Sequence, residues 1–525
     1  MSLGLTSDEL RSEWVLLLEM QWASRVFRWT SGRAVVLSSE DGELAYRPGL
    51  APSWEDAADL LSVDAEGRSI AISDLWLPED VDAAALVAAG HGLDTARAEI
   101  SLWAPGRPYE RRIVLLSGRC YAPTYGGADE PIAFSLEDRA YEDAAYLIPA
   151  EARVSRDTWP FADPANYGKA YPLVVGKPGR YLEADGSEGK TCGSPALLVH
   201  VAAKKFLVAG HAVAATTVRI INVTKGEARD ETIEQASDGL GRTVTVIDGS
   251  GTGLSVVEGD EYWCRWDDGL AAVDEETGAG LQLAGSVLRS LLRRSTVQTD
   301  RARWKAVQGY LNRYRLDFYA DDPDVTIWDW IADNLLPILP LSVVSGPRGL
   351  RPILIRPDLR VLDAVDAIEA GPTALRSSPV QYSTEDAVQL VTVSYALRGD
   401  SGDYLRSVTL SGDRLDEHTS APLRRSRLRF LRDDEEPREL RLETDVIYDR
   451  ATAELVAATL AGLHAIPHRE VSYSLDPSRF GTLEPGDVVT VTDEEVSFSD
   501  EIAVVQSVSW STTTIDVRLV LVSGL

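Results

Sequence analysis

Apolar and polar residues alternate over much of the chain, which is the pattern of half-buried β-strands. Near the start, large apolar side chains occupy every second position: Trp14, Leu16, Leu18, Met20 and Trp22. Further strand-like runs follow. The Ala-rich stretch between Pro78 and Gly90 predicts one helix, because proline favours the first turn of a helix and glycine favours its end. We therefore predict a β-barrel module with one helix over residues 1–156.

The chain changes character near Asp157. The stretch WPFADPANYGKAYPLVVGKPGRY is rich in Pro, Gly and Tyr, and we interpret it as a connector. Short strand-like runs such as KKFLVAG, TTVRIINVTKG and RTVTVIDGSG come after it, separated by turn-forming residues. Short strands with regular turns are typical of a small barrel or sandwich, which we predict over residues 157–270.

Apolar residues then recur at helical spacing. Val287 and Leu291 share one predicted helical face, with arginines off that face. Asp300 and Thr326 stand where they could cap two further helices, because short polar side chains accept hydrogen bonds from the first N–H groups of a helix. We predict a helical α+β module over residues 271–379.

Strand-like alternation returns in the last part of the chain, interrupted by one Ala-rich helix that Asp449 would cap. Arginines alternate with Leu and Phe in APLRRSRLRFLRDD (Ala421–Asp434), which predicts a strand. Its charged face is expected to be solvated or to form ion pairs with another subunit, rather than to bind nucleic acid, because an acidic run follows it. We predict a second β-barrel module with one helix over residues 380–525.

These modules define the expected fold class. It is a β-rich, multidomain α+β chain of antiparallel β-barrel or sandwich modules with a central helical module. The first and last modules share antiparallel strands and one Ala-rich helix, which suggests that they are related.

The final strands carry the most specific prediction. Pro485 and Gly486 fit a type II turn, in which the second corner needs a positive φ. In the last strand, apolar residues first alternate with Asp516 and Arg518 and then occupy both faces. A strand of this kind is expected to be covered by a neighbouring module or subunit. The candidate subunit-interface residues are Ile515, Val517, Leu519, Val520, Leu521 and Val522.

Composition and charge narrow the possible functions. The chain has 525 residues, more than one hydrophobic core usually holds, and its apolar fraction of 44% suits a folded protein. Its 82 acidic and 52 basic residues give a formal net charge of −30. This charge argues against tight, sequence-independent binding to nucleic acid, but not against a wall that nucleic acid slides past. Charged residues interrupt the apolar segment Glu13–Thr30, so we predict no signal peptide and no membrane span, and expect maturation in a cytoplasm.

Candidates for catalysis are few. Cys192 with His200 or His211 could form a thiol and base, but one such coincidence is expected by chance in a chain of this length. The three cysteines are far apart and form no CxxC pair, so neither a disulfide framework nor a zinc site is expected.

Candidates for metal or phosphate binding are also weak. His464 and His468 have the spacing of two helical ligands, but Pro467 ends the helix between them, and a helix C-terminus is the preferred interpretation. The Gly-rich stretch Val246–Val256 predicts a hairpin loop rather than a phosphate cradle, because strand-like residues follow it instead of a helix. The acidic stretch Tyr319–Val325 predicts a loop before a capped helix. We expect no catalytic residues, no cofactor, no metal ion and no enzyme activity.

The order of the segments resembles the hub proteins at the tail tips of tailed bacteriophages, of the siphophage type, a family shared with gene-transfer agents. Three parts of the sequence carry the resemblance. They are the join SGRCYAPTYGGADEPIAFSLEDRAYEDAAYLIP with YPLVVGKPGRY, the segment from GLQLAGSVLRSLLRRS through TIWDWIADNLLPILP to GLRPIL, and the end LEPGDVVTVTD…IAVVQSVSW…IDVRLVLV. The resemblance covers most of the chain and lies in the order of the segments rather than in invariant residues.

The resemblance implies a homotrimeric structural protein of the tail tip or baseplate. Two tube-like barrels from each chain, 1–156 and 380–525, would form a ring that continues the tail tube, and the last strand would lie against the next subunit. The other modules would narrow or close the channel, through which DNA passes without specific binding. Implied partners are the distal tail protein, the tail tube protein, the tape measure protein and central spike or tail fibre proteins. The implied location is the virion, after assembly in the host cytoplasm, without membrane insertion by this chain.

Two other classes of function stay open. The hub of a bacterial contractile injection system would have nearly the same fold. A secreted or cell-surface β-rich hydrolase would need a leader peptide and a cleft with convergent carboxylates, and the sequence suggests neither. No peptidoglycan-cleaving or receptor-binding domain is expected after Leu525.

Overall fold

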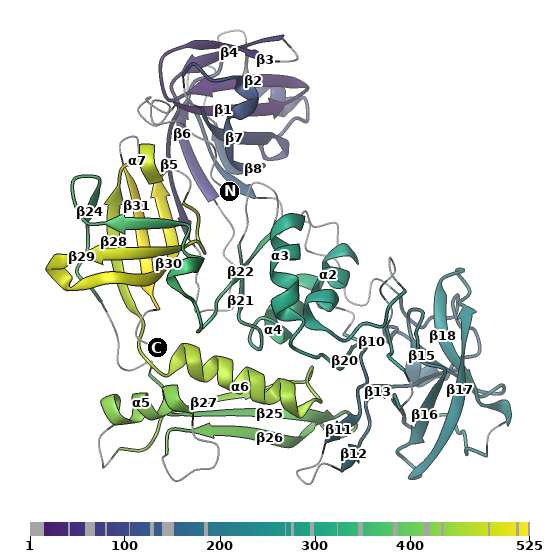
Figure 1. Cartoon of the computed structure of the whole chain (residues 1–525). Helices are drawn as coiled ribbons and strands as arrows, with labels where there is room; N and C mark the ends of the chain where they lie inside the picture. The colour runs from purple at the N-terminus through teal and green to yellow at the C-terminus, as the bar shows by residue number, and fades with distance from the viewer. Residues whose placement is uncertain are drawn as a thin grey trace.

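The computed structural model of the chain is rich in β-strands and contains few helices, so the predicted β-rich fold class is confirmed. It describes residues 15–522 except for the following positions: 40–41, 58–68, 79–80, 104, 126–130, 139–151, 183–186, 252, 268, 273, 275–277, 295–298, 323, 345–349, 382–386, 414–419, 432–434, 481–482 and 511–513. Figure 1 shows the first β module at the top, the last β-barrel beside and below it, the helices in the centre, and the second β module on the far side of the helices.

The first module is a mainly antiparallel sheet that curls around one hydrophobic core. Its elements are β1 (Val15–Trp22), β2 (Arg25–Thr30), β3 (Val35–Ser39), β4 (Gly42–Pro48), β5 (Ala51–Ala57), β6 (Ser69–Leu75), α1 (Ala83–Ala88), β7 (Arg97–Trp103), β8 (Ile113–Tyr125) and β9 (Ile132–Asp138). The strand order is β5-β6-β9-β8-β7-β1-β2-β4-β3. Leu16, Leu18 and Met20 of β1 enter the core, as their alternation predicts. The predicted helix is confined to α1, where the Asp82 side chain accepts a hydrogen bond from Ala85 N.

The second module is one antiparallel sheet with a hydrophobic cluster on each face. Its strands are β13 (Ser194–Pro195), β14 (Leu197–His200), β15 (Lys205–Ala209), β16 (Thr217–Asn222), β17 (Glu227–Ser237), β18 (Thr243–Asp248) and β19 (Tyr262–Arg265). The order is β13-β19-β16-β17-β18-β15-β14. Phe206 lies in one cluster and its chain neighbour Leu207 in the other, so β15 is buried on both faces.

The stretch interpreted as a connector covers one face of this sheet. Ala162 and Tyr171 pack with Leu207 and other residues of the β14–β15–β18 face. The Trp159 indole donates to Tyr171 Oη at 2.9 Å, and that hydroxyl donates to Asp238 at 3.0 Å. The connector interpretation is therefore wrong: the Pro- and Tyr-rich segment is part of the module, because the strands it covers are apolar on both faces.

The central part of the chain forms the largest hydrophobic core. Its helices are α2 (Ala284–Arg294), α3 (Arg301–Leu311), α4 (Ile327–Asn334), α5 (Ala421–Phe430) and α6 (Arg450–His464). Its strands are β21 (Leu341–Val344), β22 (Arg351–Leu354), β25 (Leu390–Arg398), β26 (Asp403–Ser411) and β27 (Glu439–Glu443). The strand β10 (Leu173–Val175) pairs with β20 (Phe318–Ala320), which links the segment before the second module to this part, and β11 (Arg180–Leu182) pairs with β12 (Glu188–Lys190). The predicted caps Asp300, Thr326 and Asp449 are confirmed, since each accepts a backbone N–H at the start of its helix.

Residues 390–465 pack mainly in the central core with α2, α3 and α4. The Tyr314 and Thr459 hydroxyls lie 3.0 Å apart, and Arg315 N donates to Thr452 Oγ1. Helix α6 lies along the three-stranded sheet β26-β25-β27 (Figure 1). Residues on both sides of the predicted boundary at residue 379 therefore share a core, and the Ala-rich helix packs mainly in that core, with only its end at Leu463 contacting the last barrel. The module ranges themselves stay predictions.

Residues 421–430 form helix α5, so the predicted strand is wrong. Ser420 occupies the N-cap position and Pro422 lies in the first turn, where its fixed φ suits a helix. Leu423 and Ser426, three residues apart, are both fully buried. The Ser426 hydroxyl accepts a hydrogen bond from Gln389 at 3.0 Å. Over so short a run, the pattern of Arg with Leu and Phe is compatible with the two-residue period of a strand and with the 3.6-residue period of a helix. The burial of two residues three positions apart matches the helix.

The last barrel closes the chain and joins the first module. Its elements are β23 (Asp366–Glu369), β24 (Ala374–Arg376), β28 (Arg469–Leu475), α7 (Pro477–Phe480), β29 (Val488–Asp493), β30 (Phe498–Trp510) and β31 (Ile515–Leu521). Strand β30 pairs with β29 and β31 and, at its other end, antiparallel with β5, placing Ser507 opposite Ala57. In the described part of the chain, the first and last modules thus share one continuous sheet.

A tight turn before β29 fits against the central core. Asp487 N donates to Glu484 O at 3.0 Å, and Gly486 has a φ of +88°, as the predicted turn requires. A Cβ atom at Gly486 would lie 2.5 Å from Cγ1 of Ile353 in β22. Glycine is needed at this position both for its positive φ and for the close approach of β22.

Replacing Gly486 by Ala is expected to lower the free energy of unfolding by about 2–4 kcal/mol, because positive φ is costly for Ala and the new methyl group overlaps Ile353. Gly402 is a matched control, since its φ is +76° but a Cβ atom added there would meet no other atom within 4 Å. Gly402→Ala should lose only about 1 kcal/mol. Chemical denaturation measures both variants, and equal losses would show that the turn does not pack on β22.

A buried carboxyl should make stability depend on pH. Burial raises the pKa of Asp317 to about 6, although Lys177 N at 2.6 Å and Gln282 Nε2 at 2.8 Å donate to it. The pKa of Asp317 in the folded chain lies above the ordinary value of 3.8, so the folded state binds this proton more tightly than the unfolded state does. The resulting contribution of Asp317 to the free energy of unfolding is complete at pH values below 3.8 and is lost as the pH rises through about 6. Asp317→Asn keeps an acceptor for both donors and removes this loss.

Asp317→Asn is therefore expected to be more stable than wild type by about 2 kcal/mol at pH ~7.5, with the difference shrinking towards pH ~4.5. Asp238→Asn is the control of opposite sign: although burial opposes it, hydrogen bonds from Arg242 hold the pKa of Asp238 below its usual range. This control should lose stability at pH ~7.5. Thermal unfolding at the two pH values tests both, and a pH-independent effect of Asp317→Asn would contradict the assignment.

Candidate assembly surfaces

The six residues predicted to face a neighbour are all buried within the chain, with exposed fractions of 0–8%. The predicted alternation is confirmed, because Asp516 and Arg518 are exposed while the apolar residues between them enter the core of the last barrel. On the other face, Val522 packs in a cluster with Ile353 of β22 and Leu463 of α6. The neighbour that covers the second face thus belongs to the same chain. Side chains this deeply buried offer no area to a second subunit, and no subunit contact through them is proposed.

A charged cluster fixes the turn of the last barrel to the central core. The Arg351 guanidinium is 6% exposed, pairs with the Glu484 carboxylate and donates to Pro485 O at 2.7 Å. Arg303 of α3 lies 3.4 Å from Glu484. Burial raises the pKa of Asp487 in the same turn. The two modules are therefore held by ionic contacts as well as by apolar packing.

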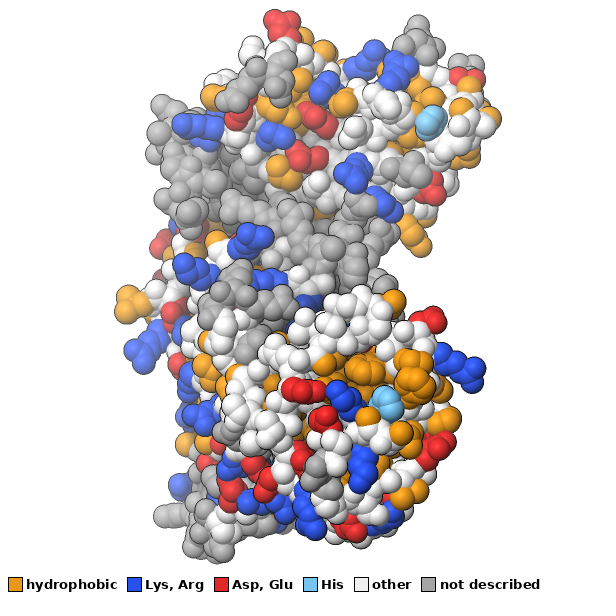
Figure 2. All heavy atoms as spheres, turned by 90° about the vertical axis from the view of Figure 1, so that its right-hand side faces the viewer, with side chains coloured by type: hydrophobic (Ala, Val, Ile, Leu, Met, Phe, Trp, Pro, Cys, Tyr) orange, Lys and Arg blue, Asp and Glu red, His pale blue; other side chains and the backbone are white. Residues whose placement is uncertain are grey.

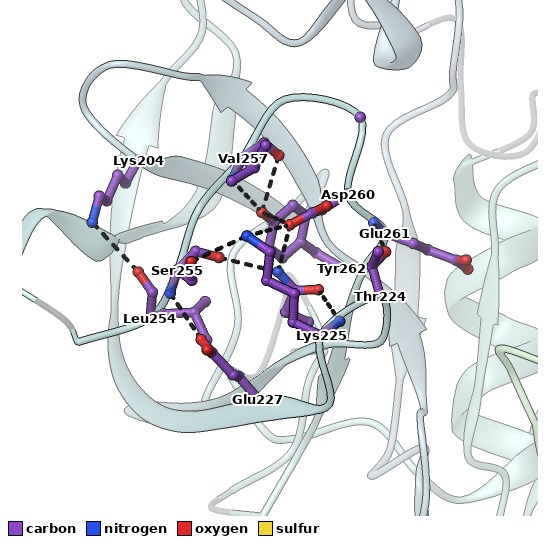
Figure 3. Close-up of polar contacts among 12 residues, drawn as sticks. Lys204, Thr224, Lys225, Glu227, Leu254, Ser255, Val257, Asp260, Glu261 and Tyr262 are labelled. Atoms are coloured by element: carbon purple, nitrogen blue, oxygen red, sulfur yellow. Dashed lines mark hydrogen bonds and ion pairs between the residues drawn. The ribbon is translucent and has the colours of Figure 1, made fainter.

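The Gly-rich stretch Val246–Val256 is not a hairpin, because β18 before it pairs with β15 and β17, whereas β19 after it pairs with β13 and β16. Figure 3 shows its end held by side chains. Ser255 N donates to the Glu227 carboxylate at 3.0 Å, and Val257 N donates to the Tyr262 hydroxyl at 2.8 Å. These N–H groups are already bound, one of them by a carboxylate that would repel an anion, so the loop does not form a phosphate cradle.

The thiol and imidazole groups considered for catalysis are structural. Burial, with the nearby Asp400 carboxylate, raises the pKa of Cys192 to about 12, which disfavours the nucleophilic thiolate. His211 is half-buried and accepts a hydrogen bond from Val174 N at 3.0 Å, and removal of its ring from water lowers its pKa to about 4. Among the residues described, no group of three or more His, Cys, Asp or Glu side chains could hold a metal ion. Over the same residues, no helix is both long and apolar enough to cross a membrane.

Exposed apolar side chains gather at one end of the second module. Phe161 and Leu240 are each 64% exposed. Their segments are adjacent, since Gly239 N donates to Thr158 O at 3.1 Å, and the Phe161 ring lies 4.9 Å from the ring of His200. Figure 2 shows hydrophobic side chains beside a histidine on this module. Exposed patches of this kind are typical of contact surfaces for other proteins. We call Phe161 and Leu240, with the adjacent ring of His200, the Phe161 patch.

Helix α5 presents an exposed basic face, which we define as Arg424, Arg425, Leu428 and Arg429. Leu428 is 76% exposed. None of the three arginines has an acidic partner within 4.0 Å among the described residues. Sequence reasoning selected this segment for its charge but assigned it to a strand. These four side chains stand at positions i, i+1, i+4 and i+5, which lie on one side of a helix but not on one side of a strand.

The comparisons with known proteins point to phage tails. Residues 424–505 match the model of a family described as putative phage tail protein, a segment that runs from α5 into β30. A tail protein from Neisseria meningitidis MC58 aligns over 97% of both chains, with 10% identity and a TM-score of 0.42. The 43 kDa tail protein of prophage MuSo2 from Shewanella oneidensis aligns over 96% of this chain and 98% of that chain, with 8% identity and a TM-score of 0.34. Prophage tail protein gp18 from Listeria monocytogenes EGD-e aligns over 93% and 94%, with 8% identity and a TM-score of 0.34.

No curated protein matches the chain. The structural likenesses are distant in both sequence and geometry, so the relationship rests on the matched segment. The resemblance to phage tail proteins is confirmed over residues 424–505, whereas the position within the tail is a separate question.

Removing the Arg351 cation should strongly weaken the junction between the turn at Gly486 and the central core. Arg351→Leu would leave Glu484 and Pro485 O without their buried partner, and a loss of about 2–4 kcal/mol in the free energy of unfolding is expected. Arg441→Leu is the control, because Arg441 pairs with Glu439 at 3.1 Å but is 64% exposed; a change within about 1 kcal/mol is expected. Denaturant titration compares the two, and losses of similar size would show that burial does not strengthen the junction.

Proposed function

We propose that the chain is a structural hub protein of a bacteriophage tail tip or baseplate, which forms a homotrimeric ring that continues the tail tube. The observation that carries the proposal is the pairing of β5 with β30, which sets two antiparallel barrels side by side in one chain. Three such chains would supply a ring of six barrels. The match of residues 424–505 to phage tail proteins supports a place in the tail.

The sheet has edges that suit a closed assembly. Strands β3 and β24 end its strand order. Unpaired edges invite pairing with another chain, and closure into a ring removes them. In this proposal, the first barrel of one chain lies against the last barrel of the next.

The remaining modules would narrow or close the channel and hold the central spike or tail fibres. The Phe161 patch is an exposed surface to which such a partner, or the distal tail, tube or tape measure protein, could bind. The excess of acidic residues suits a lumen that lets DNA pass during ejection without binding it. The protein would act in the virion after assembly in the host cytoplasm, with no catalytic step of its own.

The hub of a gene-transfer agent or of a bacterial contractile injection system is the second candidate. It would use the same ring and the same paired barrels. The image of the complete particle separates an injection system from a phage or a gene-transfer agent, because a DNA-filled head is attached to the tail only in the latter two.

Oligomeric state tests the proposal directly. Sedimentation velocity and light scattering of the purified chain should give a species of three copies, and electron microscopy should show a ring with six barrel-like lobes around a channel. A species that stays at one or two copies across the concentration range would contradict the ring. A three-copy species without a channel would contradict the continuation of the tube.

A further inference from the structure

We infer that the basic face of α5 binds the acidic surface of α4 on a second copy of this chain. The inference rests on the proposed function only in requiring that copies associate. It goes further by naming the surfaces through which they do so.

The exposed face of α5 gathers three arginines within six residues. Elsewhere, guanidinium groups such as those of Arg265 and Arg376 pair with carboxylates at 2.7 Å. Arg424, Arg425 and Arg429 have no such partner within 4.0 Å among the described residues, although the chain holds 30 more acidic than basic residues. A cationic face without a carboxylate partner among the described residues is complementary in charge to an acidic surface on another copy.

The exposed face of α4 provides the matching charge. Asp329 and Asp333 are exposed and four residues apart, so they lie on one side of the helix, and Asp322 is exposed just before it. No ion pair joins any of the three to a described lysine or arginine. Like charges at this spacing destabilise a helix by about 0.2–0.5 kcal/mol.

The helix dipoles do not account for the whole set of charges. Arg429 lies in the last turn of α5 and Asp329 in the first turn of α4, where the dipoles favour them, whereas Asp333 lies in the last turn of α4, where a negative charge is unfavourable. Contact between the two helices would bring each of these charges near opposite charges.

The exposed Leu428 identifies the partner as a protein. An apolar side chain surrounded by arginines is the composition of a protein interface, in which arginine and large apolar residues are enriched. Leu428 would gain nothing from a phosphate backbone. One leucine is also too small an apolar face to hold a helix in a lipid surface.

The contact requires a second copy because the two helices lie apart within one chain. Figure 1 shows α4 above α6 and α5 beside the left end of α6. A contact between different surfaces of two identical chains is head-to-tail, and such contacts generate a closed ring when the rotation between copies allows it. The contact is therefore compatible with a ring of three.

Reciprocal charge reversal tests the inference in the full-length chain. The α5 variant carries Arg424→Glu, Arg425→Glu and Arg429→Glu, and the α4 variant carries Asp322→Lys, Asp329→Lys and Asp333→Lys. Each is expected to weaken association, measured by sedimentation velocity, by about tenfold or more, whereas the combined variant is expected to recover most of the wild-type affinity. Wild-type association should weaken as salt rises.

The control is Lys190→Glu with Lys225→Glu and Arg229→Glu, which changes the net charge of the chain equally at exposed positions outside both helices and both barrels. It should associate more strongly than the α5 variant. Circular dichroism and thermal unfolding check that every variant is folded.

The outcomes separate this inference from the proposed function. A wild-type chain that stays a single copy would contradict the ring itself. A ring that the α5 variant still forms with wild-type affinity would overturn the inference alone, as would failure of the combined variant to recover. Loss of binding to a random DNA duplex by the α5 variant, with association unchanged, would show that α5 binds nucleic acid instead.

Discussion

The pairing of β5 with β30 is the constraint on which the arrangement of the chain depends. It brings residues near the start of the chain against residues near its end, and every other module lies between them. Backbone N–H and C=O groups on a strand edge need partners, and here the first and last barrels provide them for each other. The central helices and the second β module are thereby held as an insertion between two barrels that form one sheet.

The last barrel is also held by its contacts with β22 and α6 of the central core. Val522 and Ile353 share an apolar cluster, and Arg351 fastens the turn at Gly486 through the Glu484 carboxylate and Pro485 O. Apolar packing supplies most of the attraction, whereas the ionic contacts and the positive φ of Gly486 restrict the turn to one position.

Charge is distributed unevenly on this framework. The chain as a whole is strongly acidic, yet one exposed helix face collects arginines that form no ion pair with the described residues. Like charges four residues apart on one helix repel each other, so Arg425 and Arg429 cost stability within the described part of the chain. The contact proposed between copies would offset that cost.

The sequence by itself determined the local elements. Alternation fixed the buried face of β31, and polar residues at three N-caps located α3, α4 and α6, because strand pleat and helix ends impose short-range rules on the chain. Only the tertiary structure decided what covers the other face of β31, whether residues 421–430 form a strand or a helix, and which core α6 joins. Those outcomes depend on contacts between segments distant in the sequence. A short amphipathic run satisfies more than one local pattern, and burial against a particular neighbour selects among them.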